Sequence, residues 1–211
     1  MNSHLLELFE NEGLVNKIQE RLPRLFGIAE LECTRAEVTG MQVGSLREAI
    51  IIALLIFKFG SKNVKDFPTT EHEKDVELFG QPISIKTITG KGFGGIKASW
   101  TVDQTKSRQF TDSYQPSSDM LLVQINWGGM GGFYYIPLEV QAKLLKEIGI
   151  ENYINLPKKD TNPRGSNFNT GAMLRLVNDK DTKVIRVEWP VLKNKADSSA
   201  VYKRWIEYWS E

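Results

Sequence analysis

Apolar residues recur at helical spacing near the start of the chain, which predicts an amphipathic helix over residues 3–21. The apolar positions are Leu5, Leu6, Phe9, Leu14 and Ile18. Pro23 ends this helix or begins the next turn, because proline cannot donate a helical hydrogen bond. A second helix is expected within residues 24–38.

A third stretch, from Ser45 to about Phe59, is apolar nearly all round, so we expect a buried helix that ends at Gly60. Ser45 and Glu48 match the spacing of a capping box, in which the glutamate bonds back to the first turn. Glu48 also leads a stripe with the apolar residues four, seven and eleven positions later. A carboxylate on such an interior stripe is costly unless it is paired or binds a cation.

The rest of the chain alternates between strand and helix patterns. Strands are expected at 75–79, 83–88, 96–102, 120–127, 133–136 and 184–189. Helices are expected at 103–112, 137–148, 172–177 and 199–209, and polar loops at 61–70, 90–95, 128–132 and 157–169. This order predicts an α/β fold, a mixed sheet flanked by helices, in one domain spanning 1–211. Its parts are N-terminal helices (1–38), a core (45–150) and a C-terminal loop, strand and helix (157–211).

The hairpin formed by 75–79 and 83–88 brings charged residues together. A turn at Gly80-Gln81 pairs residues whose numbers sum to 161, which sets Asp75 directly opposite Lys86, about 5 Å apart at Cβ. Alternation gives one face to Val76, Leu78, Ile83 and Ile85, and the other to Asp75, Glu77, Ser84 and Lys86. A cross-strand ion pair on a solvated face explains Asp75 and Lys86 equally well.

The composition narrows the chemistry that such a site could perform. One cysteine and two histidines exclude a disulfide framework, a cysteine-rich zinc site and a cage of several histidines. Any metal must then be held mainly by oxygen atoms, which favours Mg²⁺, Mn²⁺ or Ca²⁺. The net charge of +1 does not by itself indicate a nucleic-acid partner. No signal peptide or membrane-spanning run is recognised, so a cytoplasmic protein is expected.

Three segments together, 40–48, Asp75 and 82–87, resemble the PD-(D/E)xK nuclease superfamily and, within it, the ThaI restriction endonucleases. The fold of that superfamily has a helix, a β-meander with an acid on one strand and a lysine on the next, then a helix and a strand. The acid that usually stands two residues before the lysine is replaced here by Ser84. A known variation moves this acid to the preceding helix, where Glu48 lies.

The resemblance implies a type II endonuclease that uses Mg²⁺ to hydrolyse double-stranded DNA at a short, CG-rich palindrome such as CGCG. Mn²⁺ could substitute for Mg²⁺, and Ca²⁺ could bind without turnover. The implied catalytic residues are Glu48, Asp75 and Lys86. Glu48, Asp75 and the carbonyl of Ile85 would hold the metal, and Lys86 would orient or deprotonate a water or neutralise the phosphate. Glu77, with Ser84, is a reserve candidate on the same face.

The same resemblance places Met41 where a methionine inserts between DNA base pairs. Lys91 and Lys97 flank a glycine-rich loop whose exposed amides suit phosphate binding. Lys158 and Arg164 belong to a second polar loop that could read base edges. An ordinary solvated loop accounts for each of these two segments as well.

A palindromic target implies a homodimer, with each protomer cutting one strand, and no membrane partner. A DNA methyltransferase is implied in the same system, without necessarily touching this chain. Two rival functions stay open. One is a structure-specific or repair nuclease with the same core. The other is a non-catalytic DNA-binding module, which the serine at position 84 supports.

Overall fold

The computed structural model describes residues 2–35, 41–67, 74–99, 103–156 and 165–192. For Arg35, Met41 and Gln104 only the backbone is described. The helix expected at 199–209 therefore lies outside the described residues, as does most of the polar loop expected at 157–169.

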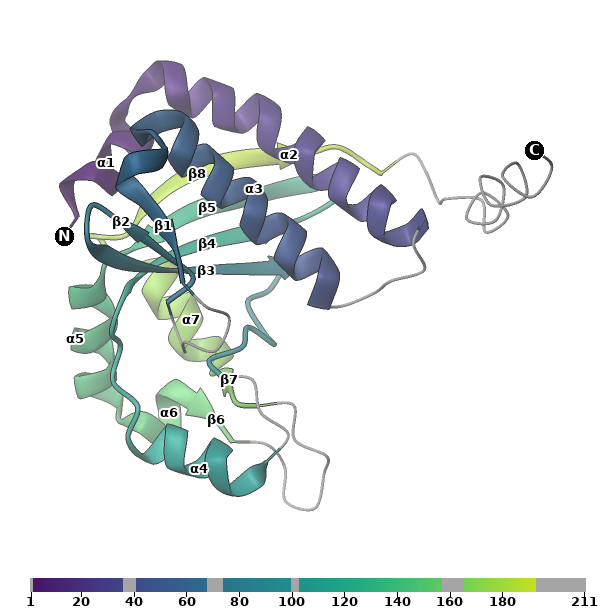
Figure 1. Cartoon of the computed structure of the whole chain (residues 1–211). Helices are drawn as coiled ribbons and strands as arrows, with labels where there is room; N and C mark the ends of the chain where they lie inside the picture. The colour runs from purple at the N-terminus through teal and green to yellow at the C-terminus, as the bar shows by residue number, and fades with distance from the viewer. Residues whose placement is uncertain (1, 36–40, 68–73, 100–102, 157–164, 193–211) are drawn as a thin grey trace, which may run out of the picture.

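A six-stranded mixed sheet forms the centre of the fold (Figure 1), in the spatial order β1-β2-β3-β4-β5-β8. Its strands are β1 (Val64–Asp66), β2 (Val76–Leu78), β3 (Gln81–Thr89), β4 (Asp119–Ile125), β5 (Gly129–Ile136) and β8 (Lys183–Trp189). The neighbours β3 and β4 are parallel, and every other neighbouring pair is antiparallel. A separate two-stranded sheet consists of β6 (Ile154–Asn155) and β7 (Asn167–Phe168). The expected α/β sheet with flanking helices is confirmed.

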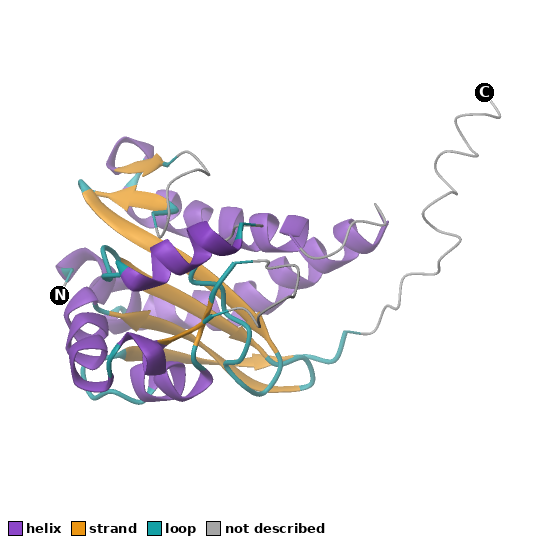
Figure 2. Cartoon of the chain, turned by 90° about the horizontal axis from the view of Figure 1, so that it is seen from below, coloured by secondary structure: helices purple, strands orange, loops and turns teal. Residues whose placement is uncertain are grey.

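Helices cover both faces of the large sheet (Figure 1), and Figure 2 views the chain from below, the side of α5 and α7. One apolar core lies between the sheet and α1 (Ser3–Glu10), α2 (Glu12–Arg35) and α3 (Met41–Phe59). A second core lies between the other face and α5 (Leu138–Ile148), α6 (Ile150–Tyr153) and α7 (Thr170–Val177). The remaining helices are α4 (Gln104–Asp112) and the short 3₁₀ turn η1 (Ser61–Asn63). No helix in these parts of the chain is long and apolar enough to cross a membrane.

The break between the first two helices comes at Asn11, not at Pro23. The Asn11 side chain accepts a hydrogen bond from the amide of Leu14 at 2.9 Å and so caps the start of α2. Pro23 lies inside α2 between Leu22 and Phe26, which are both buried. A proline within a helix costs about 3 kcal/mol. Burying two large apolar side chains contributes roughly 1.5–3 kcal/mol each, so the helix continues through the proline.

Three strands differ from the sequence expectations. Residues 129–132, expected in a loop, begin β5 because glycine permits close contact: a Cβ at Gly131 would overlap the carbonyl oxygen of Gln124 and lie 2.6 Å from Nε1 of Trp189. The strand expected at 96–102 is, where the chain is described, an isolated bridge between Lys97 and Asn167. The short strand β1 was not expected, since it lies within the segment assigned to a polar loop.

Candidate active site

The hairpin of β2 and β3 turns at Phe79 and Gly80, one residue earlier than expected. Both residues have positive φ, +49° and +80°, as a type I′ turn requires. The pair that flanks a two-residue turn is hydrogen-bonded, and the next pair is not. The observed turn places Pro82, which has no amide hydrogen, in that second pair opposite Glu77. The expected turn would have placed Pro82 in the hydrogen-bonded pair.

The strain at this turn gives a testable stability difference. Gly80→Ala should lower the free energy of unfolding by about 1 kcal/mol, because a Cβ disfavours positive φ. Gly44→Ala is the matched control, since a Cβ meets nothing within 4 Å at either glycine but Gly44 is helical. Alanine should stabilise α3 there by roughly 0.5–1 kcal/mol. Chemical denaturation measures both, and two shifts of the same sign would contradict the assigned turn.

The observed register differs from the expected one by two residues, which changes the partner of Asp75 but not its face. Val76 pairs with Ile83, so Asp75 lies opposite Ser84, and Lys86 lies two residues beyond it. The expectation that Asp75 and Lys86 are directly opposed was therefore wrong. Because side chains repeat every two residues, a shift of two keeps all three polar side chains on one side of the sheet.

The Asp75 carboxylate is the centre of the site. Its Oδ2 accepts hydrogen bonds from the Ser84 hydroxyl at 3.2 Å, the Ile85 amide at 2.5 Å and the Lys86 ammonium at 3.4 Å. The side chains of Asp75 and Lys86 are only 19% and 18% exposed, so water screens this ion pair weakly. A solvated surface pair, the alternative explanation from sequence, does not describe these buried groups.

The second oxygen of the Asp75 carboxylate and the backbone carbonyl of Ile85 are the remaining oxygen atoms to consider at this site. Among the described residues no hydrogen bond reaches Oδ1 of Asp75. The Ile85 amide points toward the end of β2 to reach Oδ2, and the amide and carbonyl of one residue point to the same side of a strand. The Ile85 carbonyl therefore points to the side of β3 on which the Asp75 carboxylate lies, and its role as a metal ligand stays a prediction.

Glu48 reaches this site from α3. The helix begins at Met41, four residues before Ser45, so Ser45 and Glu48 lie inside the helix and cannot form the capping box. Partial burial, together with the negative charge of Asp75, raises the pKa of Glu48 from 4.5 to about 7, against the opposing effect of Lys86. Glu48 is therefore close enough to Asp75 and Lys86 for their charges to act on it.

The interior line of α3 is not the one expected from the sequence. The buried residues are Arg47, Ile51 and Leu55, and Glu48 on the neighbouring line is half-buried. The spacing of four residues between Arg47, Ile51 and Leu55 was a signal that could have identified Arg47. The sequence stripe placed the Glu48 carboxylate in the interior, whereas the structure buries the guanidinium of Arg47, one residue earlier.

The other expected site residues are more dispersed. Glu77, the reserve metal ligand, forms an ion pair with Lys65 at 3.6 Å on the neighbouring strand β1. Lys91 is exposed, and its carbonyl accepts a 2.9 Å hydrogen bond from Gln124, which ties the glycine-rich loop to β4. Lys97 is half-buried at its bridge to β7. Glu77, Lys91 and Lys97 thus take no part in the hydrogen bonds and the ion pair of Asp75.

Three expected DNA contacts fall outside what the structure describes. Lys158 and Arg164 belong to the undescribed segment 157–164. Met41 is the first residue of α3, and its side chain is outside the description.

The donor set of the site fits a hard divalent cation. Two carboxylates, Glu48 and Asp75, and the carbonyl of Ile85 supply oxygen atoms, the ligands that Mg²⁺ prefers. Burial, and after it repulsion by Asp75, raise the pKa of Glu48, and a bound cation would offset both effects. Within the described ranges there is no cluster of three or more histidine, cysteine, aspartate or glutamate side chains. Mg²⁺ commonly uses one or two carboxylates, as Glu48 and Asp75 would supply, and keeps several waters.

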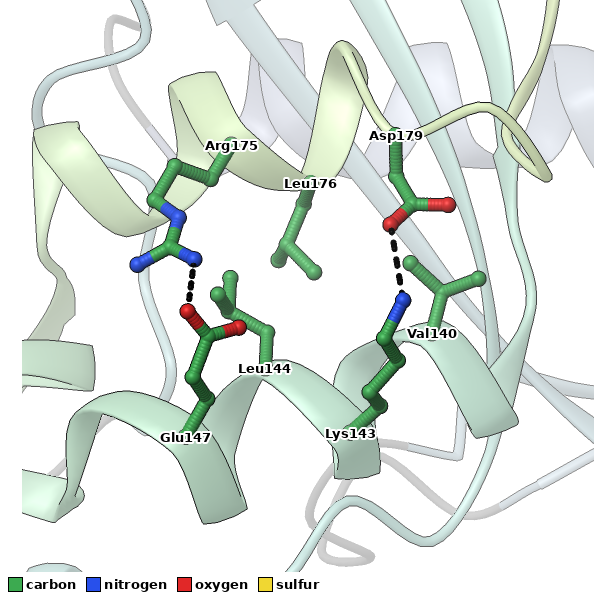
Figure 3. A pocket seen from close by; sticks show the side chains of 7 residues that line it. All are labelled: Val140, Lys143, Leu144, Glu147, Arg175, Leu176 and Asp179. Carbon is green, nitrogen blue, oxygen red and sulfur yellow. Dashed lines mark hydrogen bonds and ion pairs between the residues drawn. The ribbon is translucent and has the colours of Figure 1, made fainter.

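A small cavity between α5 and α7 belongs to a different part of the molecule (Figure 3). Three apolar side chains and two ion pairs line it, and the pairs are Lys143 with Asp179 at 3.8 Å and Arg175 with Glu147 at 2.5 Å. None of Glu48, Asp75 and Lys86 lines it. We assign it no part in the chemistry.

Comparisons with known proteins agree with this fold. The family described as "Restriction endonuclease ThaI" matches residues 8–211 of the chain. A solved structure described as a restriction endonuclease in complex with substrate DNA aligns with a TM-score of 0.89. It shares 50% sequence identity with this chain, and the alignment covers 99% of both chains. No curated protein matches the chain.

Proposed function

The chain belongs to the ThaI restriction endonuclease family, and we propose from this that it is a type II enzyme that uses Mg²⁺ to cut double-stranded DNA at a short palindrome. The partly buried group of Glu48, Asp75 and Lys86 carries the proposal, because two carboxylates and one ammonium that act on one another suit a metal-dependent nuclease site. The related structure with substrate DNA supports DNA as the ligand. The resemblance to ThaI favours a CG-rich target such as CGCG.

Hydrolysis of a phosphodiester requires a positioned nucleophile and compensation of the charge that develops on the phosphoryl oxygens. Glu48, Asp75 and the carbonyl of Ile85 would hold Mg²⁺, which when bound supplies Lewis-acid polarisation of the phosphate and acidifies a water. The Lys86 ammonium, held by Asp75, can compensate phosphate charge or orient the attacking water, and only its neutral amine form could deprotonate that water. Ser84 and the Ile85 amide fix the Asp75 carboxylate, so it needs little reorganisation during the reaction.

In this proposal the sheet and α3 carry the catalytic residues, and the loops contact the DNA. The glycine-rich loop after β3 starts four residues beyond Lys86 and is tied to β4 through Gln124. Lys91 on this loop is exposed and can contact a DNA phosphate close to the site. We further propose a homodimer, because a two-fold symmetric target is cut on both strands most simply by two related sites.

Digestion of a sequenced plasmid with Mg²⁺ tests the proposal. We expect discrete fragments whose ends all map to one short palindrome, and we expect EDTA to abolish cleavage because the oxygen ligands then hold no cation. Mn²⁺ should restore cleavage, and Ca²⁺ should support binding without cutting.

The rival functions give different results in the same experiment. A structure-specific or repair nuclease would leave a linear duplex uncut while cutting branched or damaged DNA. A non-catalytic binding module would shift the plasmid in a gel with no new ends. Either pattern would contradict the type II assignment.

A further inference from the structure

A partly buried network of polar and charged side chains centres on Arg47, the residue before Glu48 on α3. Arg47 is 9% exposed, and its Nη2 forms an ion pair with Glu30 of α2. The same nitrogen lies 3.1 Å from the hydroxyl of Thr89 at the end of β3. One side chain on α3 therefore contacts both α2 and the strand that carries Lys86.

The network crosses the elements whose relative positions define the site. Glu48 is the next residue on α3, and Lys86 lies three residues before Thr89 on β3. Any rotation or sliding of α3 against β3 would move Glu48 relative to Asp75 and Lys86. Arg47 opposes this motion from the interior side of the helix, because its contacts to α2 and β3 would have to break.

Packing alone does not account for an arginine at this position. The residues one and two turns further along the same line of α3, Ile51 and Leu55, are apolar and fully buried. A buried guanidinium loses hydration that its partners must replace. Here Nε is buried and has no hydrogen-bond partner among the described residues, so the replacement is incomplete. A residue that is costly to bury and that joins three elements is better explained by the alignment it imposes.

We propose that Arg47, through Glu30 and Thr89, is a positioning residue that holds Glu48 in place to bind the divalent cation. This inference rests on the proposed function for the identity of the metal ligands. Partners that orient a metal ligand commonly change metal affinity 10–100-fold when they are removed. Arg47 would act on Glu48 through the helix backbone without touching the metal or the DNA.

Binding of Mn²⁺ alone to the full chain, measured by electron paramagnetic resonance, tests the inference without using cleavage. Arg47→Lys keeps the charge but loses the forked donor, and Glu30→Gln keeps the shape but removes the partner charge. We expect each to weaken Mn²⁺ binding about tenfold. Thermal unfolding, followed by circular dichroism, establishes that the variants are folded at the temperature of the titration. If Arg47→Lys does not fold, Glu30→Gln decides the question.

Arg175→Lys is the control, because Arg175 also joins two helices through a glutamate, Glu147, but forms an exposed pair between α7 and α5, outside the candidate site (Figure 3). It should leave Mn²⁺ affinity unchanged. Folded Arg47 or Glu30 variants with wild-type Mn²⁺ affinity would overturn the inference and leave Arg47 a purely structural role. A Glu48→Gln variant that binds Mn²⁺ as tightly as the wild type would overturn it as well. Failure of the proposed function is separate, since it appears as absent plasmid cleavage in the wild type.

Discussion

Asp75→Asn is expected to lower the rate of DNA cleavage by about 10³-fold or more. Asparagine can still accept hydrogen bonds from Ser84 and the Ile85 amide, so the hairpin should keep its shape. The loss is electrostatic: a cation loses one of two carboxylate ligands, and the Lys86 ammonium loses its counter-ion. Removal of several kcal/mol of transition-state stabilisation corresponds to this factor.

The measurement is a single-turnover cleavage assay on a plasmid or oligonucleotide that carries the mapped site. Fluorescence anisotropy in Ca²⁺ should show that the variant still binds DNA. Glu77→Gln is the control, because Glu77 lies in β2, two residues after Asp75, and forms an ion pair with Lys65 of β1. It should retain cleavage within a few-fold of wild type. Rapid cutting by the Asp75 variant would show that the group around Asp75 is not the catalytic centre.

The sequence predicted the composition of this site better than its geometry. The turn was placed one residue late and the register two residues out, yet Asp75, Ser84 and Lys86 still emerged on one face. The reason is the period of two in a strand: an even error in register preserves the face, whereas an odd error would have scattered the site. The turn itself depends on Pro82, whose missing amide fits the non-hydrogen-bonded pair with Glu77 and not the pair that flanks the turn.

The helix that carries Glu48 shows what the sequence alone could not resolve. The capping box and the interior stripe were both compatible with Ser45 and Glu48 until the start of α3 at Met41 excluded the first. Helix starts are poorly fixed by local sequence, because caps and first turns share residue preferences with loops. Arg47 was overlooked, since its burial depends on Glu30, seventeen residues earlier, a partner that no local pattern reveals.

Long-range packing explains the remaining differences. The glycines at the start of β5 look like a loop, but they are required where the strand passes the Gln124 carbonyl and the Trp189 ring. Pro23 looks like a helix end, but α2 is long enough and buried enough to absorb it. In each case a local preference of a few kcal/mol is overridden by contacts with residues distant in the sequence.

Glu48 should make cleavage strongly dependent on pH. Burial, with the charge of Asp75, raises its pKa to about 7 in the metal-free protein. A carboxyl group must lose its proton to bind a cation. At limiting Mg²⁺ we therefore expect the cleavage rate to rise about tenfold per pH unit up to roughly pH 7 and then to level off. Saturating Mg²⁺ should move the midpoint to lower pH, because the cation competes with the proton.

The same pKa predicts the opposite trend for stability without metal. The folded protein holds the Glu48 proton between pH 4.5 and about 7, whereas the unfolded chain has already released it. Stability contributed by this proton is complete below pH 4.5 and is lost as the pH rises through 7. Glu48→Gln cannot lose a proton, so its stability relative to wild type should increase across this range while its cleavage is lost.

Urea denaturation of both proteins in EDTA, at several values between pH 4.5 and 8, measures that difference. Added Mg²⁺ should then stabilise the wild type more than the glutamine variant, because the variant lacks a charged ligand. A stability difference that does not change with pH would show that Glu48 is not a buried carboxyl coupled to Asp75. A Glu48 carboxylate that lowers stability without metal, yet is required for cleavage with metal, is placed to bind a cation and not to stabilise the fold.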